Sequence, residues 1–117
     1  MRKELQDLVF LGRLENTVEL AGNHWTLTTL SAQDRLDATL ASSGNQDAIA
    51  RISSLKIELL KRSLKKVNAT EFRNADEVAE FVGQLQGIII DRLFTKYEDL
   101  QAEHEKALDN IDDLKNS

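Results

Sequence analysis

The sequence predicts a mainly α-helical fold with one N-terminal β-hairpin. Apolar and polar residues alternate between residues 14 and 30, which is the period of a β-strand, and apolar residues recur at helical spacing from residue 31 onward. No proline interrupts either pattern in the 117 residues. We expect a single domain, 1–117, in three parts: an N-terminal segment with the hairpin (1–30), short and middle helices (31–73) and a long helix (74–115).

The first segment, Met1 to Leu11, fits a short helix that Gly12 ends. The hairpin follows, and Gly22-Asn23 is a suitable two-residue turn for it. With that turn, the opposed pairs are Leu20 with Trp25 and Val18 with Leu27. All four share one face, which must be buried, while Glu19 and Thr26 face outward.

Two helices are expected in the middle of the chain. Ser31, with Asp34 three residues later, begins a short helix that runs through Leu36 and Leu40 to Ser43, and Gly44 ends it. Asn45 or Ser43 caps a second helix that extends to about Val67. Its apolar stripe consists of Ile49, Ile52, Leu55, Leu59, Leu60, Leu64 and Val67.

The longest patterned stretch runs from Asn74 to about Leu114. Asn74 with Glu77 suits a helix N-terminus, and apolar residues continue at helical spacing for about 40 residues. One helix of that length would span roughly 60 Å, more than a globule of this size, so part of it should project or meet another chain. Gly83 and Gly87 indicate either a close backbone approach, which we favour, or a bend.

The end of this stretch has the spacing of a coiled-coil seam. Positions four and three apart are occupied by Leu93, Tyr97, Leu100, His104, Ala107, Ile111 and Leu114. Residues 98–113 carry a charge of −6, with His104 counted as neutral. Two interpretations remain open: a solvated tail, or a docking surface for a basic partner.

The middle helix is the one basic element, because residues 51–67 carry +5. Opposite charge favours contact between the two helices, although exposed ion pairs contribute at most about 1 kcal/mol each. Alternatively, a basic helix over 51–66 could contact phosphate through Lys61, Arg62, Lys65 and Lys66. The net charge of −5 and the absence of interleaved aromatic residues argue against nucleic acid as a partner.

No pattern in the sequence indicates a reaction. Cysteine is absent, and neither His24 nor His104 has another histidine at ligand spacing. We therefore expect no catalytic, cofactor-binding or metal-binding residues, no small-molecule substrate and no enzymatic activity. Neither a signal peptide nor an apolar run of membrane-spanning length is visible, so we expect no membrane association and a cytoplasmic location.

One segment resembles a known group of proteins. Residues 10–34 follow the form V-x-L-x-G-x-x-aromatic-x-L-x-x-L-[ST]-x-x-[DE], from Val18 and Leu20 through Trp25 and Leu27 to Asp34. This looks like the opening of small tail and baseplate assembly proteins of tailed bacteriophages, in which a short hairpin leads into a helical body. The resemblance implies a non-enzymatic virion component, or a chaperone of tail assembly.

Two functional hypotheses follow. The favoured one is a structural or assembly protein, such as a phage tail, baseplate or neck component or a tail assembly chaperone, that binds copies of itself or larger structural proteins. Its expected contact residues are Trp25, Leu27, Gly83, Gly87, Tyr97, Leu100, His104, Ile111 and Leu114. The alternative is a small nucleic-acid-binding regulator that uses the basic helix.

Overall fold

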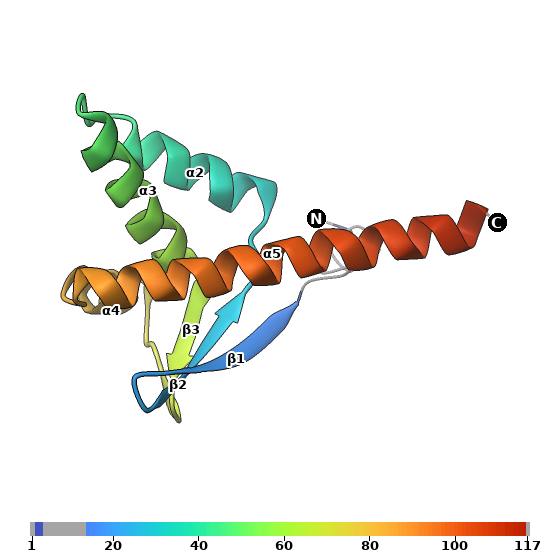
Figure 1. Ribbon diagram of the computed structural model, residues 1–117, viewed down its shortest axis with the longest axis horizontal. Helices are drawn as coiled ribbons and strands as arrows, with labels where there is room; N and C mark the ends of the chain where they lie inside the picture. The colour runs from blue at the N-terminus through green and yellow to red at the C-terminus, as the bar shows by residue number, and fades with distance from the viewer. Residues whose placement is uncertain (1, 4–13, 117) are drawn as a thin grey trace.

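The computed structural model describes residues 2–3 and 14–116, and side chains from Leu14 only as far as Asp109. The helix expected over Met1 to Leu11 therefore lies almost entirely outside the described residues. The elements are β1 (Glu15–Leu20), β2 (Asn23–Thr28), α2 (Ala32–Ser42), α3 (Ala48–Ser63), β3 (Leu64–Val67), β4 (Thr70–Glu71), α4 (Ala75–Gly83) and α5 (Gly87–Asn116) (Figure 1). The mainly helical class with an N-terminal hairpin is confirmed.

The hairpin forms, but its turn lies one residue earlier than expected. Ala21 and Gly22 both have positive φ, 54° and 75°, as a tight two-residue hairpin turn requires. The opposed pairs are consequently Leu20 with Asn23, Val18 with Trp25 and Asn16 with Leu27. The predicted pairs are wrong, yet Val18, Leu20, Trp25 and Leu27 still share one face. The observed register differs from the predicted one by two positions, and a shift by an even number leaves each side chain on the same face of the sheet.

The hairpin is half of a four-stranded antiparallel sheet with the order β1-β2-β3-β4. The prediction that the middle helix continues to Val67 is wrong, because the backbone becomes extended at Leu64 and β3 pairs with β2. This makes β2 a central strand. Thr26 is therefore buried rather than outward-facing, and its hydroxyl shares a hydrogen bond of 2.8 Å with that of Thr17.

The connection expected over 68–72 is a second hairpin. Asn68 has φ 55°, a left-handed conformation that asparagine tolerates better than most residues. Its side-chain oxygen accepts a hydrogen bond from the backbone N–H of His24, and its amide nitrogen donates to Asn23. Asn68 thereby joins the tips of the two hairpins.

The helices α2 and α3 form an antiparallel pair that stands above the sheet (Figure 1). Ser31 caps α2 as predicted, accepting a hydrogen bond from the Asp34 N–H at 3.1 Å. Asp47 caps α3 in place of Asn45 or Ser43, accepting from the Ile49 N–H. The cap prediction failed here by two residues because three good capping residues lie close together.

The long helix is broken. The side chain of Asn74 accepts from the Glu77 N–H at 2.8 Å and so caps α4 as predicted, but α4 ends at Gly83 and α5 starts at Gly87. A Cβ added at either glycine would meet no atom within 4 Å. No other described part of the chain therefore approaches either glycine closely, and the bend is confirmed.

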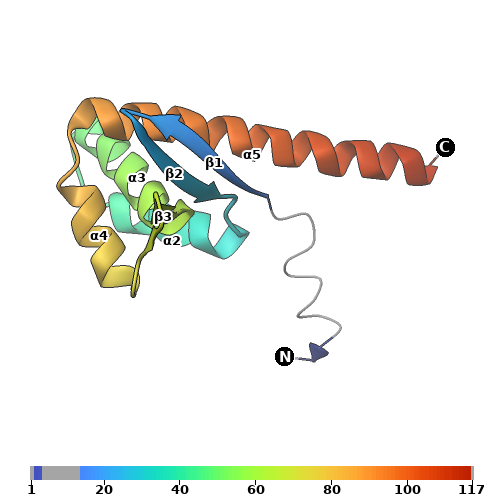
Figure 2. The ribbon, with the colours of Figure 1, turned by 90° about the horizontal axis from the view of Figure 1, so that it is seen from below.

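The core lies where α3, α4 and α5 meet the apolar face of the sheet. Trp25 packs against Phe81 of α4 at a ring-centroid distance of 6.1 Å, and Phe81 packs against Phe72 at 5.4 Å. The N-terminal part of α5 runs along the sheet, while its C-terminal part continues past β1 with no described element beside it (Figures 1 and 2). The radius of gyration is 15.6 Å, against about 13 Å for a compact chain of this length.

Candidate interaction surfaces

The helix α5 divides into a part packed against the described body and a C-terminal part whose described side chains are mostly exposed. Ile90, Leu93, Tyr97 and Leu100 are all buried at helical spacing against the body. The Gln101 side chain accepts a hydrogen bond from the Leu30 N–H at 3.4 Å, which is the last hydrogen bond from α5 to the body among the described residues. Beyond this residue, most side chains as far as Asp109 are exposed.

The residues of the predicted coiled-coil seam therefore differ in their surroundings. Its first three members, Leu93, Tyr97 and Leu100, belong to the core of the chain itself. His104 is half-buried and Ala107 is exposed, while the side chains of Ile111 and Leu114 lie outside the described ones. Only the part of the seam after Leu100 can still meet another chain.

Acidic residues are frequent on α5 from Glu98 onward. Glu98, Asp99, Glu103, Glu105 and Asp109 are all exposed. None of them forms an ion pair with a described residue; the one ion pair between α3 and α5 joins Lys56 to Asp91 at 3.1 Å. The predicted attraction between the acidic stretch and the basic helix thus does not produce an ion pair within the described chain.

Several predicted contact residues are corrected by the structure. Trp25, Leu27, Tyr97 and Leu100 are each at most 5% exposed, so in this conformation they pack within the chain and offer little surface to a partner. Their apolar character was recognised correctly, but the sequence does not show whether a buried face is covered by the same chain or by another. Gly83 and Gly87 mark the exposed bend between α4 and α5.

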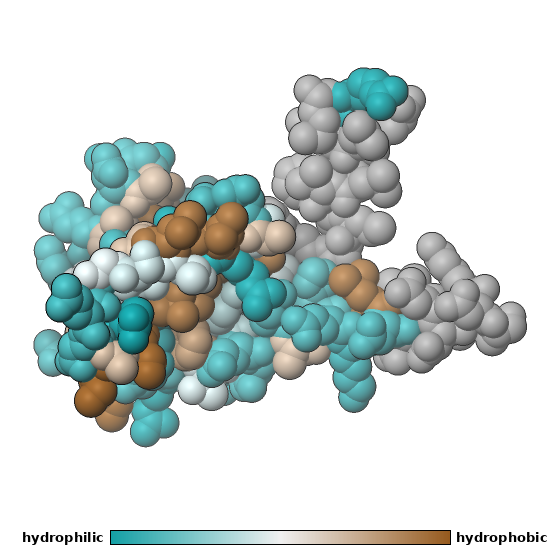
Figure 3. All heavy atoms as spheres, turned by 90° about the horizontal axis from the view of Figure 1, so that it is seen from above, coloured by the Kyte–Doolittle hydropathy of each residue, from teal (hydrophilic) through white to brown (hydrophobic). Residues whose placement is uncertain are grey.

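The largest exposed apolar side chains lie elsewhere, on α2 and at the starts of α3 and α5. Leu36 and Leu40 of α2 are 51% and 61% exposed. Hydrophobic residues gather over α2 and the start of α3 in the view of Figure 3. The remaining exposed members are Ile49, Ile52 and Ile88. Their helical spacing was visible in the sequence, but it indicated only that one face is apolar, not that this face remains exposed.

The four basic residues proposed to contact phosphate are only partly brought together. Lys61, Arg62 and Lys65 line a hollow of about 340 Å³ beside the start of α4, which Asp34 also lines. Lys61 and Arg62 both form ion pairs with Glu58, at 3.0 and 2.9 Å. Lys66 follows Lys65 on a strand and so projects from the opposite face of the sheet. The four residues therefore do not lie on one helix, because Lys65 and Lys66 belong to β3.

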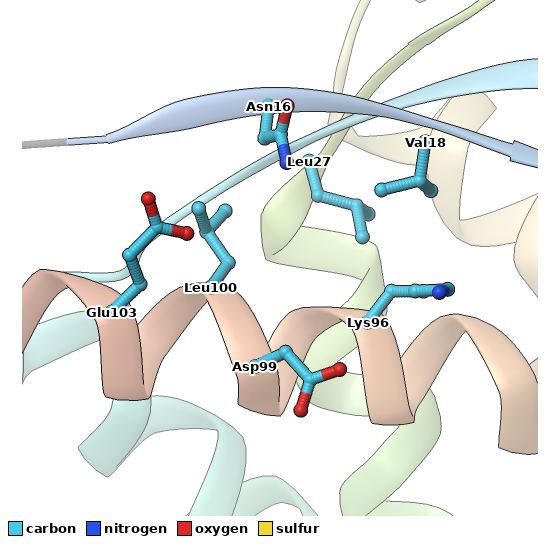
Figure 4. Close-up of a pocket in the computed structure, with 7 residues that line it drawn as sticks. All are labelled: Asn16, Val18, Leu27, Lys96, Asp99, Leu100 and Glu103. Atoms are coloured by element: carbon cyan, nitrogen blue, oxygen red, sulfur yellow. The ribbon is translucent and has the colours of Figure 1, made fainter.

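Another hollow, of about 170 Å³, lies between the hairpin and α5. Asn16, Val18 and Leu27 point from the strands toward α5, and Leu100 points back toward them (Figure 4). Lys96, Asp99 and Glu103 complete the lining. No serine, threonine, cysteine or histidine is among the residues that line it.

The two histidines have different surroundings. His24 is exposed beside the first turn. Both ring nitrogens of His104 are buried and lack a hydrogen-bond partner within the described part of the chain. Among the described residues, no group of three or more His, Cys, Asp or Glu side chains could hold a metal ion. None of the helices described is both long and apolar enough to cross a membrane.

Comparison of the chain with protein-family models, curated proteins and solved structures gave no significant match.

Proposed function

We propose that this chain is a non-enzymatic structural or assembly protein that acts through contacts with other protein chains. The observation that carries this proposal is the C-terminal part of α5, which continues beyond the body after Gln101. An isolated helix of this length is marginal in water, and most helices in proteins are stabilised by packing of one face. A partner chain would supply that packing.

The break between α4 and α5 weakens part of the sequence-based argument. The predicted uninterrupted helix of about 40 residues is not present, because α4 and α5 are separate, and α5 uses Ile90, Leu93 and Leu100 to stabilise its own body. Two features still support association. Ile88 remains 61% exposed, and the seam position Ala107 is exposed as well.

Within this class, the resemblance of residues 10–34 favours a tail, baseplate or neck component of a bacteriophage virion, or a tail assembly chaperone. The extended α5 fits a structural component better than a chaperone. We infer that such a protein is made in the host cytoplasm and binds its own copies or larger structural proteins. Nothing in the arrangement of Lys61, Arg62 and Lys65 favours the nucleic-acid-binding alternative, because Glu58 and Asp34 offset much of their charge.

Photo-crosslinking from the end of α5 tests this proposal. A benzophenone amino acid replaces Ala107, an exposed seam position, in the cells that naturally produce the protein. The matched control places the same group at Glu80, which is exposed on α4. We expect a discrete protein adduct from position 107 and none from position 80. No adduct at 107, or the same adducts at both positions, would contradict the proposal.

A further inference from the structure

The strand β1 lies at one edge of the sheet, and half of its backbone groups point away from the sheet. The sheet order gives β1 one neighbour, β2, and no described strand pairs with its other side (Figure 1). The Thr29 N–H donates to the Leu14 carbonyl oxygen at 3.0 Å, so these two residues form a hydrogen-bonded pair. Such pairs alternate with non-hydrogen-bonded pairs along antiparallel strands. The N–H and C=O groups of Glu15, Thr17 and Glu19 therefore point outward, away from β2.

This edge lacks the features that commonly prevent an edge strand from pairing. Proteins blunt such edges with very short strands, proline or a β-bulge. The strand β1 has six residues, contains no proline and pairs with β2 in a continuous register. At the opposite edge of the sheet, β4 has only two residues. A further strand can therefore be added along β1, whereas β4 offers little length for pairing.

The outer face of β1 is acidic. Glu15 and Glu19 are exposed, and the residues opposite them on β2 are Thr28 and His24, so neither glutamate has a lysine or arginine across the strand. The lysine of β3 that shares this outer face lies two strands away, opposite a glutamate of β4. The two carboxylates on β1 are therefore available to a cationic partner.

These carboxylates disfavour a second copy of the chain as the added strand. Two β1 strands related by a two-fold axis pair antiparallel, and the register with the longest overlap is centred on Thr17, because its backbone groups point outward. In that register, Glu15 of each copy lies opposite Glu19 of the other. Like charges directly opposite each other are destabilising. A strand with basic residues at these positions is favoured instead.

The core side of the edge has room for side chains of an added strand. The hollow of about 170 Å³ between β1 and α5 lies next to Asn16 and Val18, which point toward α5 (Figure 4). Side chains alternate between the two faces of a sheet, so an added strand directs every second side chain to the side of this hollow. Val18 and Leu27 make part of its lining apolar. Apolar residues therefore suit these positions of the partner.

The described surroundings of the edge carry a negative charge overall. On α5, residues spaced three or four apart share one side of the helix and are exposed: Arg92, Lys96, Asp99 and Glu103. Asp99 and Glu103 form no ion pair with a described residue. With Glu15 and Glu19, four carboxylates stand against two cations, a net charge of −2. This excess favours a basic partner segment over a neutral or acidic one.

We propose that the outer edge of β1 binds an extended segment of another protein, which continues the antiparallel sheet and carries lysine or arginine opposite Glu15 and Glu19. Apolar residues of the segment face the hollow at the alternating positions. Backbone hydrogen bonds supply affinity in strand addition, and the alternating side chains supply specificity. This inference rests on the proposed function, because it names a partner for protein contacts and a surface other than the end of α5.

Peptide binding to the full chain tests the inference. The probe is a fluorescein-labelled peptide, Val-Lys-Val-Thr-Val-Lys-Val, whose lysines have the spacing of Glu15 and Glu19. Fluorescence anisotropy should give a dissociation constant of about 10–300 μM. The peptide with glutamate in place of both lysines should bind at least about 10-fold more weakly, because it repeats the acidic pattern of β1.

Modified peptides separate strand addition from simple charge attraction. In the antiparallel arrangement, the N–H of the threonine opposite Thr17 donates to β1, whereas the N–H groups of the neighbouring valines point away. Methylation of the threonine nitrogen should therefore weaken binding at least about 10-fold. Methylation of one neighbouring valine nitrogen is the matched control and should change it by less than about 3-fold.

Variants of β1 test the same contact from the protein side. Thr17→Pro removes an outward N–H and should weaken binding at least about 10-fold. Thr17→Val is its control, because it also loses the hydrogen bond to the Thr26 hydroxyl but keeps the N–H, and it should bind as wild type does. Glu15→Lys with Glu19→Lys should reverse the preference, so that the glutamate peptide binds more tightly. This reversal remains a test if circular dichroism shows that the proline variant unfolds.

Several results would overturn the inference: no saturable binding of the lysine peptide up to about 1 mM, equal effects of the two N-methyl groups, or an unchanged preference after charge reversal. A dimer in sedimentation equilibrium that Thr17→Pro abolishes would assign the edge to a second copy and also overturn it. The photo-crosslink from position 107 reports on a separate surface. An adduct there without peptide binding rejects only the β1 contact, whereas peptide binding without that adduct rejects the role proposed for α5.

Discussion

The Ser63 hydroxyl, at the C-terminus of α3, donates a hydrogen bond of 2.7 Å to the main-chain carbonyl oxygen of Thr28, at the end of β2. The two residues are 35 positions apart, and both are buried. This bond ties the helix to the central strand at the point where the chain leaves α3 and enters β3. It therefore fixes where the helix ends and the sheet begins.

Removing the Ser63 hydroxyl should destabilise the fold. Ser63→Ala leaves a buried carbonyl oxygen with one partner fewer, and we expect the free energy of unfolding to fall by about 1–2 kcal/mol. Ser53→Ala, at an exposed position of the same helix, should change it by less than about 0.5 kcal/mol. Urea unfolding of both variants measures the difference. Equal effects would mean that the bond does not stabilise the fold.

The cap of α4 gives a second prediction. The Asn74 side chain accepts from the Glu77 N–H, and Glu77 accepts in return from the Arg73 N–H at 3.1 Å. Asn74→Ala should lower the unfolding free energy by about 1 kcal/mol, while Asn74→Ser, which keeps a capping oxygen, should retain most of the stability. Thermal unfolding of the two variants compares them. A serine variant as unstable as the alanine variant would show that capping is not the cause.

The division of α5 into two faces gives a third prediction. Leu93 is fully buried against the body and Ile88 is exposed, although both were expected on one apolar stripe. Leu93→Ala should cost about 2–5 kcal/mol of unfolding free energy, through lost burial and a new cavity. Ile88→Ala should cost less than about 0.5 kcal/mol. Chemical denaturation tests both, and similar losses would indicate that α5 is rotated relative to the structure.

The pH dependence of stability should contain a contribution from Glu58. Burial of this carboxyl group raises its pKa, but the hydrogen bonds and charges of Arg62 and Lys61 outweigh that effect, so its pKa lies below the ordinary 4.5. The stabilisation is thus present above the unfolded-state pKa and is lost as the pH falls through the lower, folded-state pKa. In urea titrations, the stability advantage of wild type over Glu58→Gln should shrink below about pH 4.5. An advantage independent of pH would contradict this.

The single tyrosine provides a direct optical test of the core. Burial raises the pKa of the Tyr97 hydroxyl above 10, although the nearby Arg35 charge opposes the shift. Because the folded-state pKa is the higher one, this contribution to stability is present below pH 10 and is lost as the pH rises through the folded-state pKa. Absorbance of tyrosinate in the ultraviolet should rise at a higher pH in the folded chain than in urea-unfolded chain. Coincident curves would place Tyr97 in solvent.

Local signals explain which elements were predictable. Ser31 and Asn74 cap helices as expected, because capping depends on the residue and its next turn. The shared apolar face of the hairpin was also predictable from its period of two. The position of its turn was not predictable, because Ala21-Gly22 and Gly22-Asn23 both contain a glycine that suits a two-residue turn. The local sequence does not distinguish between them.

Tertiary contacts explain why the bounds predicted for the middle helix and the long helix were wrong. Leu64 and Val67 continue the helical spacing of α3, yet they join β2 because the hairpin needs a third strand to bury its central residues. The spacing of Val78 through Leu100 likewise continued across Gln84–Gln86, where two helices fold against one core. The exposure of Leu36 and Leu40 could not be predicted, since an apolar stripe does not reveal what covers it.

Amide hydrogen exchange of α5 in the purified chain tests most directly whether its C-terminal part lacks support from its own body. We predict that amides of residues 102–109 exchange at least about 100-fold faster than those of residues 91–100, because most side chains of the first stretch are exposed whereas Leu93, Tyr97 and Leu100 are buried. Equal, strong protection across both stretches in dilute monomer would mean that the chain satisfies the whole helix itself, and would contradict the role proposed for α5.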